Sequence, residues 1–131
     1  MNNSKTGDSK LYENLGKLFY SVSACDGHIH ELETLQLKQL VKYKWMSLEE
    51  FDGADAATHI ETTFYWLVSQ SANFEECFVA FENYKKDHSE IFSKEICKLT
   101  LNTAYAIADA FEGINNEEMA MLKRLVKILK N

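Results

Sequence analysis

Apolar residues recur at helical spacing along most of the chain. One face of a first helix is marked by Leu11, Leu15, Leu18, Phe19 and Val22. This helix should end near Asp26-Gly27, because glycine readily adopts the left-handed conformation that stops a helix. The sequence contains no proline and no window of sustained strand-like alternation. We therefore expect an all-α protein, a compact single-domain bundle of about six to seven helices.

The same periodicity and the capping residues place the later helices. They are predicted over residues 31–44, 56–69, 73–86, 89–111 and 116–130, with a short helix that begins at Ser47 and ends at Gly53. Residues 89–111 should form the longest helix, whose alanine-rich second half allows another helix to approach closely.

The polarity of the first residues sets the expected domain boundaries. Residues 1–9 are polar and are predicted to be a flexible segment, followed by one domain over residues 10–131. A chain of 131 residues is long enough to bury a single apolar core. Core filling explains most aromatic residues, whereas Tyr12, Tyr20 and Tyr43 are also candidates for an interaction patch.

An internal repeat is the most informative feature of the sequence. Residues 24–33 recur in degraded form at residues 110–118, and alignment of Ile29 with Ile114 also matches the helices that follow. The matched pairs are Glu33/Glu118, Leu37/Leu122, Lys38/Lys123, Leu40/Leu125, Val41/Val126 and Lys42/Lys127. Because such repeats usually pack against each other, we predict that the two turns lie close together in the fold.

The acidic residues of the two turns allow two interpretations. In the structural interpretation, Glu33 and Glu118 are the third residues of their helices, where a carboxylate accepts hydrogen bonds from free backbone amides. In the functional interpretation, Asp26 and Glu33 bracket a glycine turn and converge on a hard cation. Additional oxygen ligands are then offered by Asp109, Glu112, Glu117 and Glu118.

The spacing around Gly27 matches only half of a known calcium loop. Asp26, Gly27, Ile29 and Glu33 hold the relative positions found in the second half of an EF-hand loop. Val22 and Ala24 stand where its first two ligands belong, so any cation must take ligands from elsewhere in the fold. His28 and His30 form a His-x-His pair that suits zinc, but histidines on a solvated turn are more often simply exposed. Calcium or magnesium is therefore favoured over zinc.

Composition and charge narrow the function classes. The formal net charge of −6 disfavours nucleic acid as a partner, since phosphate binding depends on clustered Lys and Arg. No apolar run approaches the roughly 18 residues of a membrane span, and the first residues lack the core of a signal peptide, so a cytoplasmic location is expected.

Cys25, Cys77 and Cys97 are expected to be reduced and mostly buried. No common hydrolase motif is present, so we expect no enzyme activity.

The alanine-rich helix end, the segment from Asp26 to Glu33 and its copy from Ala108 to Glu118 resemble the TerB-like family associated with tellurite resistance. The resemblance implies an all-helical bundle whose acidic turns form a metal-binding or interaction surface. The matching positions are Asp26, Glu33, Glu112 and Glu118. The second turn departs from the first, because glutamate precedes Gly113 and the turn is one residue shorter.

Two functions of different class follow from these observations. The first is a non-enzymatic module with a divalent-metal-binding role, a protein-interaction role or both in a stress response, with a protein partner of unknown identity. The alternative is a small metal-dependent hydrolase that uses the acidic turns.

Overall fold

The computed structural model describes residues 3–27, 29–45 and 53–130, and these form an all-α bundle. Its six α-helices are α1 (Asn3–Ala24), α2 (Glu31–Leu40), α3 (Gly53–Gln70), α4 (Phe74–Asp87), α5 (Lys94–Asp109) and α6 (Asn116–Lys130). A π-helical turn, η1 (Val41–Trp45), continues α2, and a 3₁₀ turn, η2 (Ser89–Ile91), follows α4. The predicted fold class is confirmed.

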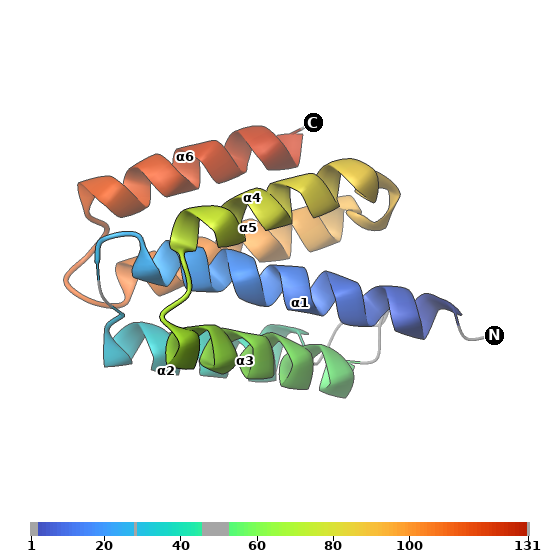
Figure 1. The fold of residues 1–131 in the computed structure, drawn as a ribbon, viewed down its shortest axis with the longest axis horizontal. Helices are drawn as coiled ribbons and strands as arrows, with labels where there is room; N and C mark the ends of the chain where they lie inside the picture. The colour runs from blue at the N-terminus through green and yellow to red at the C-terminus, as the bar shows by residue number, and fades with distance from the viewer. Residues whose placement is uncertain (1–2, 28, 46–52, 131) are drawn as a thin grey trace.

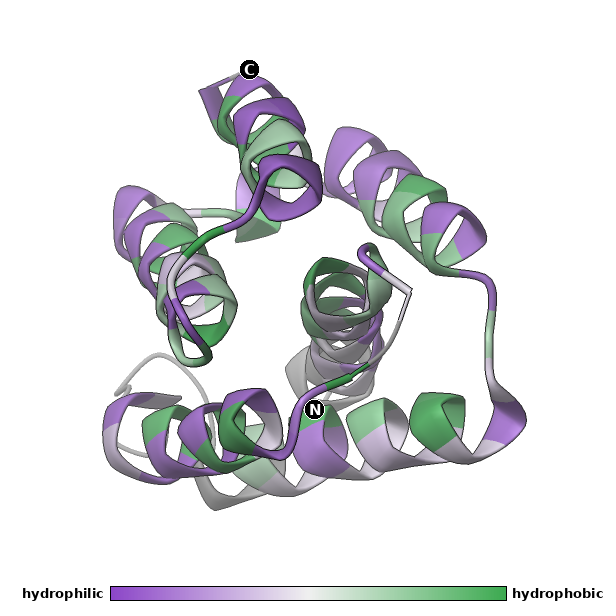
Figure 2. Cartoon of the chain, turned by 90° about the vertical axis from the view of Figure 1, so that its left-hand side faces the viewer, coloured by the Kyte–Doolittle hydropathy of each residue, from purple (hydrophilic) through white to green (hydrophobic). Residues whose placement is uncertain are grey.

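Helix α1 is the centre of the bundle because its apolar side chains point to several sides. Leu11, Leu15, Leu18 and Phe19 are fully buried, and Tyr12 and Tyr20 are buried as well. A helix that is apolar on most sides needs neighbours all round it. Helices α2 and α3 lie along one side of α1, and α4, α5 and α6 lie along the other (Figure 1). Viewed from the end, the apolar faces of the outer helices turn inward (Figure 2).

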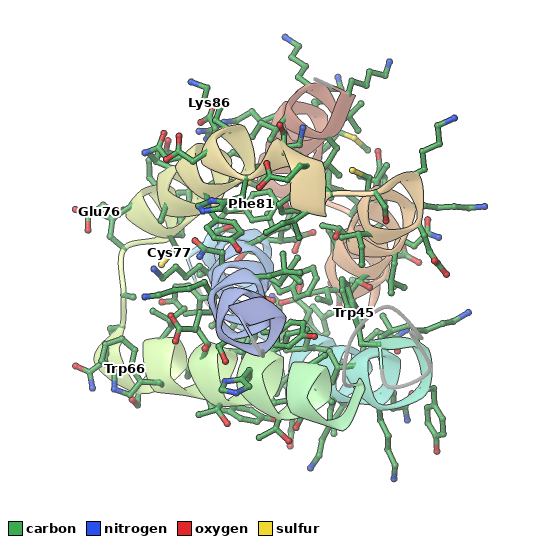
Figure 3. The ribbon with its side chains drawn as sticks, turned by 90° about the vertical axis from the view of Figure 1, so that its right-hand side faces the viewer. Trp45, Trp66, Glu76, Cys77, Phe81 and Lys86 are labelled. Carbon is green, nitrogen blue, oxygen red and sulfur yellow. The ribbon has the colours of Figure 1, made fainter. Side chains whose placement is uncertain are left out.

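Polar groups inside the bundle find defined partners. The Trp45 indole Nε1 donates a hydrogen bond to Thr103 Oγ1 at 3.1 Å and so joins η1 to α5. The Tyr20 hydroxyl donates to the Ala72 carbonyl at 2.7 Å. Trp45 and Phe81 point toward the interior, whereas Trp66 lies at the outer edge of α3 (Figure 3). Tyr12 and Tyr20 are core residues, so they form no interaction patch, and of the three candidates only Tyr43 is exposed.

Several predicted boundaries differ from the structure. Residues 3–9, predicted to be a flexible segment, belong to α1, because each residue added to an existing helix gains a backbone hydrogen bond. Gly53, predicted to end a short helix, is the first residue of α3, and the predicted capping box at residues 47–50 lies outside the described residues. The second helix is close to its prediction, although its last turn, η1, is π-helical.

The predicted longest helix over residues 89–111 is wrong. Residues 89–91 form η2, and α5 begins only at Lys94, where Ser93 Oγ accepts a hydrogen bond from the Ile96 amide at 3.2 Å. Phe92 has a non-helical ψ of 77°, which interrupts the helix. The longest described helix is α1, whereas α6 has its predicted bounds and α4 matches within one residue at each end.

No helix among the described residues is both long enough and apolar enough to span a membrane. The described cysteines form no disulfide: Cys77 is buried, and Cys25 and Cys97 are half-buried.

Candidate functional site: the paired acidic turns

The turn after α1 and the turn after α5 lie side by side at one end of the bundle (Figure 1). Asn115 Nδ2 donates a hydrogen bond to Asp26 Oδ2 at 2.9 Å. The His30 ring stacks on Phe111, with 4.0 Å between the ring centroids. The prediction that the two turns of the internal repeat lie close together is therefore confirmed.

Positive φ angles reverse the chain direction in both turns. Gly27 has φ of 106° and Gly113 has φ of 82°, values that glycine adopts at little cost. Glu112 also has a positive φ, 57°, which is uncommon for a residue with a Cβ. Both turns therefore use glycine in the left-handed region at equivalent places of the repeat.

Glu33 and Glu118 each accept a hydrogen bond from the backbone at the start of their helix. Glu118 Oε1 accepts from the Asn115 amide at 3.1 Å, and Asn115 Oδ1 accepts from the Glu118 amide at 2.8 Å, which completes a capping box. Glu33 Oε1 accepts from the His30 amide at a longer 3.4 Å. The predicted capping role of both glutamates is therefore confirmed.

Unlike ordinary capping residues, both glutamates are buried. Glu33 is 0% exposed and Glu118 is 1% exposed. Burial raises the pKa of Glu33 well above its usual range, and a side-chain hydrogen bond with Glu118 raises it further. The backbone hydrogen bond from His30 opposes this effect, while the charges of Glu118 and Asp26 add to it. Burial and the contact with Glu118 therefore both favour the neutral, protonated form of Glu33, which can donate a hydrogen bond to the Glu118 carboxylate.

One oxygen of this pair has no hydrogen-bond donor. Glu33 Oε2 is buried and accepts no hydrogen bond from the described residues. An ionised Glu33 would leave this buried oxygen without a donor, which is costly, so its position also favours the neutral form of Glu33. A proton or a bound cation at this oxygen would remove that cost.

The other predicted site residues lie nearer the surface. Asp26 and His30 are mostly buried, with Asp26 Oδ2 3.7 Å from His30 Nε2, and Glu112 is exposed. An open pocket of about 290 Å³ is lined by Asp26, His30, Phe111, Glu112, Gly113, Asn115 and Glu118. Three of the four predicted metal ligands thus line one pocket, whereas Glu33 does not line it and interacts with Glu118.

The described residues do not form a ready-made metal site. Within the part of the chain that the structure describes, no three His, Cys, Asp or Glu side chains are arranged to hold a metal ion. The donors near the pocket are carboxylate and amide oxygens, which suit calcium or magnesium better than zinc. A cation bound here would need side-chain rearrangement, together with water or backbone oxygens, to complete its coordination.

The described histidines do not converge. His30 lies against Phe111, His59 stacks on Tyr12 at 6.1 Å between ring centroids, and His88 stacks on Tyr84 at 4.4 Å. His28 lies outside the described residues, so the His-x-His zinc hypothesis stays a prediction.

Two contributors to the site were not singled out by the sequence. Asn115 is by residue type a good helix cap, but its second role as a donor to Asp26 depends on the packing of two distant turns. Cys25 precedes Asp26, and burial together with the charges of Glu118 and Asp26 raises the pKa of its thiol to about 12. The alignment of Asn115 with His30 in the repeat was the available signal for the first role.

Comparisons with protein-family models, with curated proteins and with solved structures gave no match to this chain.

Proposed function

We propose that this protein is a non-enzymatic binding module whose paired acidic turns take up a divalent cation, calcium or magnesium, in exchange for a proton. The observation that carries this proposal is the buried Glu33 Oε2, which has no donor and belongs to a carboxyl in hydrogen-bond contact with Glu118. A cation bound at this oxygen would replace the proton of Glu33 and would compensate the charge of the ionised carboxylate.

Binding needs only small rearrangements of the groups nearest the pocket. The 3.4 Å hydrogen bond from His30 to Glu33 is long and therefore weak, so the Glu33 carboxyl can turn away from it at little cost. Asp26 and Glu118 already line the pocket. Glu112 lines it as well, and because its side chain is exposed, it can change its orientation toward a cation. These carboxylates with water can reach the six or more oxygens that calcium requires.

The resemblance to the TerB-like family supports the same proposal and suggests a role in a stress response. It carries over Asp26, Glu33, Glu112 and Glu118 as the candidate ligands. In this proposal Glu33 and Glu118 both cap helices and bind the cation, so occupancy of the site would change how firmly α2 and α6 are held together.

Titration calorimetry with calcium, magnesium, manganese and zinc tests the proposal directly. Because the cation displaces the proton of Glu33, the observed heat at pH 7 should depend on the ionisation enthalpy of the buffer, with up to about one proton released per ion. The ion should also raise the melting temperature, since it binds only the folded state.

Asp26→Asn is the informative variant for this titration. It keeps an oxygen that can accept from Asn115, so the metal-free protein should melt as the wild type does, whereas stabilisation by the ion should disappear. Asp87→Asn, an exposed change at the end of α4, is the matched control and should leave binding intact. No heat and no change in melting with any of the four ions would reject cation binding. Turnover of ester substrates by the ion-loaded protein would instead support the metal-dependent hydrolase.

A further inference from the structure

A groove lies on the face of the bundle remote from α4 and α6. It runs between α3 and the segment formed by the end of α2 and η1, and its volume is about 420 Å³. Lys38 and Lys42 line one wall, and Glu61 and Tyr65 line the other, with Ala57 and Thr62 also in contact with the space. Helix α3 packs on α1 and on η1, and α2 and α3 lie on the side of α1 away from α4 and α6 (Figure 1).

Exposed apolar side chains extend the groove. Tyr65 is 41% exposed in its wall, and Val68, three residues later on α3, is 38% exposed. Leu35, three residues before Lys38 on α2, is 49% exposed. Residues three or four apart lie on one face of a helix, so the α3 wall continues into two exposed apolar residues and the α2 wall into one. Exposed apolar residues on both sides of a groove give a partner helix apolar surface to cover.

The charge of one wall is opposite to that of the protein. Residues 34–45 contain three lysines and no acidic residue, in a chain with a formal net charge of −6. Neither lysine of this wall lies within 4 Å of a described carboxylate, although Lys38 and Lys42 both act through their charge on Glu61 across the groove. Lys42 Nζ lies 5.7 Å from the centre of the Tyr43 ring. Of the described acidic residues, only Glu61 lines the groove.

We propose that this groove docks an amphipathic helix of a partner protein whose polar rim is acidic. The apolar side of the helix would cover Leu35, Tyr65 and Val68, and its carboxylates would meet Lys38 and Lys42. A helix suits the space because its walls are themselves two helices, which a third can pack against by ridges and grooves. This surface is separate from the paired acidic turns, so the inference does not depend on the proposed cation site.

Two designed helical peptides test the inference. They share one set of leucines, and one carries glutamate and the other lysine at every polar position. Titrated into the ¹⁵N-labelled protein, the glutamate peptide should shift the backbone amide signals of residues 35–42 and 57–68. The lysine peptide should bind at least about tenfold more weakly, which is the size of effect expected from two rim charges.

Charge reversal and a matched control complete the experiment. K38E/K42E should weaken the glutamate peptide by about tenfold or more and should favour the lysine peptide. K123E/K127E makes the same change at the same spacing on α6 and should leave binding unchanged. If K38E/K42E does not fold, K38Q/K42Q should still give a measurable loss. Absence of binding, shifts elsewhere, or equal losses in both charge-reversed variants would overturn the proposal. Preferential binding to vesicles of anionic phospholipid, lost in K38E/K42E, would overturn it in favour of a membrane surface.

Discussion

Asn115 and Asp26 are 89 positions apart in the chain, yet Asn115 Nδ2 donates to Asp26 Oδ2 at 2.9 Å. The same asparagine also caps α6 through its Oδ1. One side chain therefore uses its oxygen within its own half of the repeat and its nitrogen across to the other half.

Asn115→Asp should separate these two roles. Aspartate keeps the oxygen that caps α6 but loses the donor and places a second negative charge beside Asp26. We expect a loss of about 1–2 kcal/mol in the free energy of unfolding at pH 7, measured by urea denaturation. Asn116→Asp, an exposed change in the next residue, is the control, and an equal loss in both variants would contradict the cross-turn role.

Glu33→Gln should flatten the dependence of stability on pH. Because the folded state raises the pKa of Glu33, the folded protein holds a proton that the unfolded chain releases. Its contribution to stability is thus fully present below the ordinary glutamate pKa of about 4.5 and is lost as pH rises toward the raised value. Glutamine needs no proton, so the variant should lose little or no stability at pH 7 and should not show this decline. Glu33→Ala should cost on the order of 1 kcal/mol, because it also loses the cap.

The exposed Glu31, in the first turn of α2, provides the comparison for this experiment. Glu31→Gln removes the same charge from the same helix end but should leave the decline of stability with pH as in the wild type. Denaturation curves from pH 4 to pH 9 for the wild type, Glu33→Gln and Glu31→Gln measure this decline of stability with pH. A wild-type stability that rises over this range would show that Glu33 is ionised in the folded protein.

Gly16→Ala should destabilise the contact between α1 and α3. A Cβ added at Gly16 would lie 2.7 Å from Thr63 Cβ and 3.1 Å from the Ile60 carbonyl oxygen. Alanine is favoured over glycine inside a helix by about 1 kcal/mol, so any net loss must come from this overlap. We expect a net loss of about 1–3 kcal/mol by thermal or urea denaturation. Gly113→Ala tests the cost of backbone strain alone. An added Cβ at Gly113 would meet no atom within 4 Å, so only the positive φ of +82° disfavours alanine there. A more stable Gly16→Ala protein would show that the two helices separate easily.

The three thiols should react slowly in the folded protein. Burial raises the pKa of Cys77 and Cys97, and burial with neighbouring carboxylates raises the pKa of Cys25 to about 12. Since the thiolate is the reactive form, labelling by a disulfide reagent at pH 8 should be at least about a hundredfold slower for Cys25 than in urea. Rapid native labelling of Cys25 would mean that the end of α1 opens often.

Helix boundaries were predicted correctly where the residues that set them lie next to the boundary in the sequence. Helix α6 has its predicted bounds because Gly113, Asn115 and Glu118 are all close to its start and act on it directly. The start of α5 was missed because Ser89 and Ser93 are equally good caps by type, and only the non-helical Phe92 between them selects the second. The extent of α1 was missed because polar residues give no periodic signal.

The candidate ligands Asp26, Glu33, Glu112 and Glu118 came from the resemblance, and their binding of a cation stays a prediction. The structure brings Asp26, Glu112 and Glu118 to one pocket, and Glu33 interacts with Glu118. The burial of Glu33 and Glu118 could not be predicted, because a capping glutamate is normally solvated. Their burial arises from the packing of one half of the repeat on the other. The donor role of Asn115 depends on the same long-range packing.

The π-helical turn at Val41–Trp45 makes the second helix differ from its counterpart α6 in the other half of the repeat. A π turn closes its hydrogen bonds over one residue more than an α turn, so η1 contains one residue beyond what an unbroken helix needs. The corresponding stretch of α6 is regular. The extra residue changes the direction of the last turn, from which Trp45 donates to Thr103 on α5. A one-residue deletion within residues 41–45 should therefore restore regular α-helical turns at the cost of this hydrogen bond.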